Sequence, residues 1–130
     1  MSSCESVSER REYKQNGEPT VNARIEVDAG VCGYRSIILA RSEDDQNVSF
    51  TITSGCEKIR SLADRLQAHN PVDAYREIDP NGESVVLTTV RQCLKSCCAG
   101  CAVPSGIFKG MQVAAGLALP KDISIRIVTE

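Results

Sequence analysis

The chain has 130 residues, of which 42% are hydrophobic and 25% charged, and its formal net charge is -2. A chain of this length can bury a core without needing disulfides, and an aliphatic composition without tryptophan is typical of one globular domain. The nearly balanced charge gives no support to nucleic acid or a membrane surface as a partner. We therefore expect a single domain that binds neither.

The first 20 residues are polar and charged, which predicts a flexible N-terminal tail over 1–20 and a single domain over 21–130. The start of the chain lacks the apolar stretch of a signal peptide, and no later run approaches the roughly 20 apolar residues of a spanning helix. These features predict a cytoplasmic protein. In a reducing compartment, clustered cysteines are more often metal ligands or reactive groups than disulfides.

Three segments have the patterns of strands, and two of them, "VNARIEVD" and "VSFTIT", alternate between apolar and polar residues. The segments "VNARIEVD" (21–28), "YRSIILAR" (34–41) and "VSFTIT" (48–53) are separated by short turns and indicate an antiparallel meander. Near the end of the chain, "DISIRIVT" (122–129) places Ile123, Ile125 and Ile127 on one face. We expect this segment to close the sheet as a C-terminal strand.

Helical spacing appears in three other segments. Ser54 and Glu57 have the form of a capping box, which predicts a helix start with Cys56 in its first turn. A second helix is expected from Thr88 or Thr89 to position 98, and a third, apolar nearly all round and therefore buried, over 104–118. The predicted fold class is α+β: an antiparallel sheet, formed by a three-stranded meander plus a C-terminal strand, with helices packed on one face.

Seven cysteines give the chain its chemical character, and an odd number leaves no complete set of internal disulfides. Cys32 lies between two glycines in a predicted turn, Cys56 opens a helix and Cys101 precedes the buried helix. Helix starts stabilise thiolate, the form that binds metal, attacks disulfides or accepts sulfur. These three cysteines are therefore the first candidates for ligands or reactive thiols.

The segment "CLKSCCAGCAVP" (93–104) holds the remaining candidates. Cys97 and Cys98 are adjacent, so on a helix their side chains would point about 100° apart, and we expect one of them to face the same site as Cys101. Cys93 is as well explained by core packing as by ligation. Cys4, in the polar tail, is expected to be a free thiol without a role.

The order of these features resembles the U-type iron–sulfur cluster scaffold proteins: an "AGVCG" turn between strands, "SGC" at a helix start, and a cysteine leading into a late apolar helix. The resemblance implies that Cys32, Cys56 and Cys101 bind a cluster and accept sulfur. It also implies a homo-oligomer and a sulfur-donor or cluster-acceptor protein as partners.

Two positions depart from that family's pattern. Tyr34 stands where the family usually has an aspartate that tunes cluster release, and Gly100 stands where it often has a histidine. These departures favour a permanently held cluster over transient assembly and handover. The chain also resembles a small cysteine-rich family of unknown function from anaerobic archaea and bacteria, through "CAVPSGIFKGMQVAAGLALPKDISI".

The sequence favours a binding role over catalysis. His69 is the only histidine, and neither a phosphate-binding loop nor a dinucleotide-binding glycine motif is present. We expect an iron–sulfur protein that holds its cluster through Cys32, Cys56 and Cys101, with Cys97 or Cys98 as the fourth ligand. A structural four-cysteine zinc site remains an alternative. So does a thiol-based sulfur carrier or redox protein, which would need a thiol with a lowered pKa.

Overall fold

The computed structural model describes residues 22–130, apart from the side chain of Cys97. The predicted tail over 1–20, with Cys4, lies outside the described residues. None of the helices within residues 22–130 is long and apolar enough to cross a membrane.

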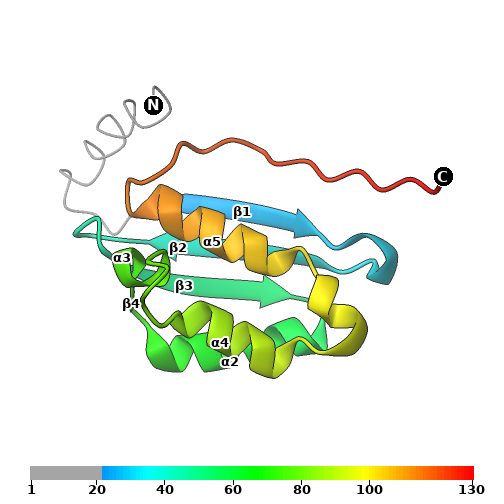
Figure 1. Ribbon diagram of the computed structural model, residues 1–130, viewed down its shortest axis with the longest axis horizontal. Helices are drawn as coiled ribbons and strands as arrows, with labels where there is room; N and C mark the ends of the chain where they lie inside the picture. Colours follow the sequence, from blue (N-terminus) through cyan, green and yellow to red (C-terminus); the bar gives the residue numbers. More distant parts are fainter. Residues whose placement is uncertain (1–21) are drawn as a thin grey trace.

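The sheet is antiparallel and has the strand order β1-β2-β3-β4 (Figure 1). Its strands are β1 (Ala23–Asp28), β2 (Arg35–Arg41), β3 (Asn47–Ser54) and β4 (Val72–Asp73). The register aligns Ile25 with Ile38 and Ile38 with Ile52, so these apolar side chains share one face. The predicted meander is confirmed.

Four α-helices and two short 3-10 turns complete the described fold. The helices are α2 (Glu57–His69), α3 (Ala74–Glu77), α4 (Val85–Cys93) and α5 (Val103–Ala114), and the 3-10 turns are η3 (Gly30–Cys32) and η4 (Ser96–Gly100). In Figure 1, α5 lies over β1 and β2, while α2 packs on β3 and is itself packed by α4. The predicted class, an α+β fold with helices packed on a sheet, is confirmed.

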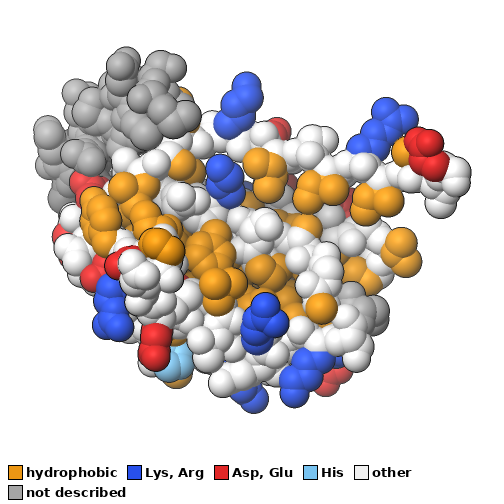
Figure 2. Space-filling view, in the orientation of Figure 1, with side chains coloured by type: hydrophobic (Ala, Val, Ile, Leu, Met, Phe, Trp, Pro, Cys, Tyr) orange, Lys and Arg blue, Asp and Glu red, His pale blue; other side chains and the backbone are white. Residues whose placement is uncertain are grey.

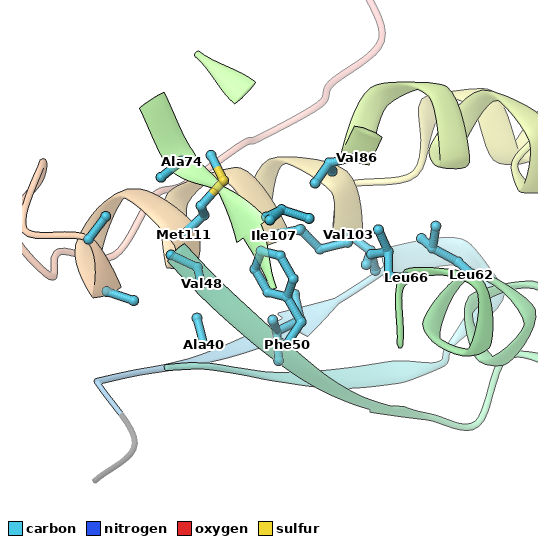
Figure 3. Close-up of a cluster of buried hydrophobic side chains, with 14 of the residues drawn as sticks. Ala40, Val48, Phe50, Leu62, Leu66, Ala74, Val86, Val103, Ile107 and Met111 are labelled. Atoms are coloured by element: carbon cyan, nitrogen blue, oxygen red, sulfur yellow. The ribbon is translucent and has the colours of Figure 1, made fainter. Parts of the chain in front are cut away.

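The core lies between the sheet and the helices α2, α4 and α5 (Figure 3). Ile107 and Met111 of α5 are fully buried, as the apolar pattern of that helix predicts. A Cβ atom on Gly106 would lie 2.9 Å from Cγ2 of Val27, so a glycine is what lets α5 approach β1 closely. This close packing fixes where α5 begins relative to the end of β1.

The predicted C-terminal strand is wrong: within the described chain, residues 119–130 belong to no helix or strand. The fourth strand is instead β4, which pairs with the start of β3. The exposed fractions of Ile123, Ile125 and Ile127 are 54%, 70% and 88%. Alternation shows that a segment suits an extended conformation with one apolar face, but a strand also needs a partner edge.

Two predicted helix starts are also wrong. Ser54 ends β3 and Cys56 is the N-cap residue of α2, because the Ser54 hydroxyl accepts the Cys56 N–H at 3.0 Å and does not cap the helix. Ser84, not a threonine, is the N-cap of α4 and accepts the Leu87 N–H at 2.9 Å. That helix ends at Cys93, so the predicted continuous helix to position 98 is broken into α4 and η4.

Candidate cysteine site

Four chain segments that carry cysteines meet at one end of the sheet, on the right in Figure 1. They are η3 between β1 and β2, the connection from β3 to α2, η4, and the entry into α5. We call this region the cysteine end and define it by Cys32, Cys56, Cys98 and Cys101. It is the end at which β1 finishes, β2 begins and β3 finishes.

Cys32 lies in a tight turn that two glycines make possible. Gly30 and Gly33 have φ values of 83° and 76°, in the left-handed region that favours glycine. The Gly33 N–H donates to the Gly30 carbonyl at 2.8 Å, and the Gly30 N–H donates to Asp28 Oδ1 at 3.1 Å. The predicted turn is confirmed, and it presents Cys32 as an exposed residue.

Cys56 lies where β3 passes into α2. Its backbone is extended, with φ -82° and ψ 126°, and its carbonyl accepts the N–H of Arg60 at 3.0 Å. Its side chain is half-buried. The ring of Tyr34 covers the preceding residue, because a Cβ atom on Gly55 would lie 3.1 Å from Tyr34 Cδ1.

That contact ties the Cys32 turn to the start of α2, since Tyr34 follows Cys32 by two residues and Gly55 directly precedes Cys56. Tyr34 is 46% exposed, so its ring forms part of the surface between the two thiols. Sequence reasoning noted Tyr34 only as a departure from a family pattern. No local motif could have revealed a contact between residues 21 positions apart.

Cys98 and Cys101 lie close together at the end of η4. The Cys101 N–H donates to the Cys98 carbonyl at 3.1 Å, and both side chains are half-buried against the core. Cys101 directly precedes the first turn of α5. Its Sγ accepts the N–H of Val103 at 3.5 Å, a contact that favours thiolate.

Burial nevertheless raises the pKa of the Cys101 thiol above its ordinary value, and the Val103 N–H offsets only part of that effect. Smaller contributions in the same direction come from negative charge on Cys32, Cys56 and Cys98. For Cys101, the shift is opposite to the lowered pKa that a sulfur carrier would need.

Cys93 and Cys97 differ from the four cysteines that define the cysteine end. Cys93 is the last residue of α4 and is half-buried against the core, which fits its reading as a packing residue. Cys97 lies in η4 beside Cys98, and its side chain is outside the part of the chain that the structure describes. Of the two adjacent cysteines, the described thiol that acts on Cys101 is that of Cys98.

The thiols of the cysteine end are near one another without forming a finished metal site. Among the described side chains, no three histidine, cysteine, aspartate or glutamate residues stand close enough together to hold a metal ion. The donor set nevertheless fits a soft metal or an iron–sulfur cluster, because it consists of sulfur alone. Binding would require side chains to turn inward, and Cys32, on an exposed turn, is free of packing that would prevent this.

The fold and these residues define a small α+β domain with four thiols gathered at one end of its sheet. The chain belongs to the family of unknown function DUF6951, whose model matches residues 23–127. Neither a curated protein nor a solved structure shows significant similarity to the chain.

Proposed function

We propose that this protein binds an iron–sulfur cluster through Cys32, Cys56, Cys98 and Cys101, with Cys97 as the alternative fourth ligand. The observation that supports this most directly is that Cys32, Cys56, Cys98 and Cys101 lie on four segments that meet at one end of the sheet. They come from segments far apart in the sequence, and ordinary core packing gives no reason for so many cysteines to meet at one end of a sheet. All-thiolate ligation is what clusters of this kind use.

The position of the site suggests the kind of role. The cysteine end is at the surface, and Val31 and Tyr34 expose apolar side chains around Cys32. A cluster held there would be accessible to another protein, which suits cluster assembly, carriage or electron transfer better than turnover of a substrate. The partners would be a second copy of the chain, a sulfur-donor protein or a cluster-acceptor protein.

The chain's own groups would each make a definite contribution. The Val103 N–H would donate to the sulfur of Cys101, and the closely packed start of α5 would hold that sulfur in place. The raised pKa of Cys101 means that ligation must displace its proton near neutral pH. Loading of the site should therefore become more favourable as the pH rises.

A four-cysteine zinc site uses the same residues and is the main alternative. A structural zinc ion would contribute folding free energy, so its removal would unfold the domain. Cys56, Cys98 and Cys101 are only partly buried against the core, whose centre consists of fully buried apolar residues such as Ile38, Leu62 and Ile107. We therefore expect the metal-free domain to remain folded, which distinguishes a bound cargo from a structural ion.

The first experiment is to measure iron, zinc and acid-labile sulfide per chain, on protein purified without oxygen. Iron and sulfide in comparable amounts would support a cluster. Stoichiometric zinc without sulfide would replace the proposal with the zinc alternative. Neither metal, together with rapidly alkylated thiols, would leave the sulfur-carrier alternative.

Cysteine variants test the ligand set. Cys56→Ser and Cys101→Ser should each abolish the visible absorbance of the reconstituted cluster, while Cys93→Ser and Cys4→Ala should retain it. Cys93→Ser is the matched control, because Cys93 is also a half-buried cysteine packed against the core. Equal absorbance in Cys56→Ser and Cys93→Ser protein would overturn the ligand assignment.

A further inference from the structure

Residues 122–129 have the sequence of a strand but lie unpaired along the surface. Ile123, Ile125 and Ile127 alternate with polar residues, and more than half of the surface of each isoleucine is exposed to solvent. Figure 1 shows this segment extended beyond the end of the helix layer, and Figure 2 shows hydrophobic side chains standing at the surface in that region. Three isoleucines in water on one face of an extended segment are typical of an interaction surface.

The sheet offers an edge that suits such a segment. β1 is the first strand in the order β1-β2-β3-β4, so one of its two sides has no neighbouring strand in the described chain. Its apolar residues Ala23, Ile25 and Val27 pack against the core but remain only partly buried. An open edge with incompletely covered apolar side chains is ready to accept another strand.

From these two features we propose that the protein forms a dimer by strand exchange, in which residues 122–129 of each copy pair with the free edge of β1 in the other. Each copy supplies one unpaired segment and one open edge, so the exchange is reciprocal and closes with two-fold symmetry. The match to the family model begins at Ala23, the first residue of β1, and ends at Ile127, the last of the three isoleucines. β1 and the three isoleucines therefore fall within the family's shared region.

The side-chain pattern of the two segments is complementary. Because successive residues of a strand point to opposite faces, a register that places the isoleucines beside Ile25 and Val27 must place Arg126 on the opposite face. That outer face of β1 carries the exposed charged residues Arg24, Glu26 and Asp28, and Glu26 is already paired with Arg24 at 3.2 Å and Arg35 at 3.3 Å. This arrangement holds whether the added strand runs parallel or antiparallel to β1.

A second copy is the occupant that the structure favours. The segment does not pair with its own β1 within the described chain, even though Figure 1 shows it passing on the same side of the molecule. Exchange between copies would bury the isoleucines and satisfy the edge of β1 without any change in the fold of either chain. The proposal does not depend on the cysteines, so it can fail while the cluster proposal stands, and the reverse.

Sedimentation equilibrium of the full-length, reduced protein in the presence of a chelator would test the proposal, over about a hundredfold range of concentration. The expected result is a reversible dimer. Ile125→Asp and Ile127→Asp should each raise its dissociation constant by at least about a hundredfold, because each change occurs twice in the dimer and removes a buried isoleucine. Both residues are exposed in the single chain, so these variants should fold normally.

Ser124→Asp is the matched control, since it adds the same charge one residue away, on the face that would remain exposed. It should leave the dissociation constant within about threefold of wild type. A dimer that survives Ile125→Asp would overturn the proposal, because its interface would lie elsewhere. A monomer at every concentration would also overturn it, and hydrogen exchange would then show whether 122–129 closes on its own β1 or stays open for a different protein.

Discussion

The two ends of the sheet are built differently. At the end opposite the cysteines, three carboxylates hold the connecting segments together: Asp44 in the turn between β2 and β3, Asp73 at the start of α3, and Glu77 at the end of α3. We call this region the carboxylate end. At the cysteine end, the connecting segments carry the thiols of Cys32, Cys56, Cys98 and Cys101.

The carboxylate end is closed by short hydrogen bonds. Asp44 accepts the Asn47 N–H and the Asn47 side-chain amide, each at 2.8 Å, and Gln46 donates its side-chain amide to Asp73 at 3.0 Å. Glu77 is buried and accepts the Val85 and Val86 N–H groups at 2.7 and 2.9 Å. These bonds satisfy the free N–H groups of turns and helix starts.

At the cysteine end, Asp28 accepts the Gly30 N–H at 3.1 Å and the Ser54 hydroxyl accepts the Cys56 N–H at 3.0 Å, while the described thiols take little part in such bonds. The one hydrogen bond of these thiols joins Val103 N–H to Cys101 Sγ at 3.5 Å, and ionised thiols there would repel one another. The carboxylates at one end of the sheet therefore hold the connecting segments together, whereas the described thiols at the other end contribute little to holding the fold together. Substitutions at the two ends should therefore affect different measurements.

The largest expected effect on stability comes from Glu77. Glu77→Ala should lower the free energy of unfolding by about 3 kcal/mol, because it removes a buried carboxylate and leaves two N–H groups at the start of α4 without their acceptor. Urea unfolding of the metal-free protein would measure this. Glu83→Ala changes an exposed acid just before the same helix and should stay within about 0.5 kcal/mol of wild type.

A Glu77→Ala protein as stable as the Glu83→Ala control would break the comparison at its carboxylate end. The role of Glu77 could not have been predicted from the sequence, because it caps α4 from eight residues before the first helical residue. Local capping rules search the residues adjacent to a helix, and there Ser84 already fits them.

The fold could be predicted where the sequence pattern and a partner agree. β1 and β3 alternate between apolar and polar residues, β2 contains a short apolar run, and the three lie one after another along the chain, so each finds its neighbour through a short turn. Residues 122–129 alternate equally well but have no open neighbour next to them in sequence, and they stay unpaired. Periodicity therefore predicts conformation, while pairing depends on tertiary arrangement that a single pattern does not contain.

The candidate site shows the same division. The glycines around Cys32 predict its turn because the left-handed backbone is a local requirement, and the structure has that turn. The contact between Tyr34 and Gly55 joins the Cys32 turn to the residue before Cys56, and the end of α4 at Cys93 sets the start of the segment that carries Cys98. Neither feature leaves a local signal in the sequence.

A smaller effect on stability, with a characteristic pH dependence, is expected at Asp44. Its pKa is held well below the ordinary value of 3.8, chiefly by the Asn47 side chain and then by the Asn47 and Gln46 N–H groups. A lowered pKa in the folded state means that the carboxylate stabilises the protein above pH 3.8 and that this contribution is lost as the pH falls through the folded-state pKa. Asp44→Asn should therefore be less stable than wild type near neutral pH, and the difference should narrow in acid.

Urea unfolding of both proteins across that acid range would measure the difference, with Glu43→Gln, a change at the neighbouring exposed acid, as the control. A constant gap between wild type and Asp44→Asn at every pH would mean that the hydrogen bonds of Asp44 do not depend on its charge.

The smallest expected effect on stability comes from Cys32→Ser at the cysteine end. Its contrast with Glu77→Ala is the sharpest test of the difference between the two ends. Cys32→Ser should leave the free energy of unfolding of the metal-free protein within about 0.5 kcal/mol of wild type, because Cys32 is exposed and the backbone of its turn depends on Gly30 and Gly33. The same substitution should remove a ligand and abolish the absorbance of the reconstituted cluster. A loss of stability as large as that of Glu77→Ala would contradict the comparison, since it would make the Cys32 thiol part of the fold instead of a donor held for a ligand.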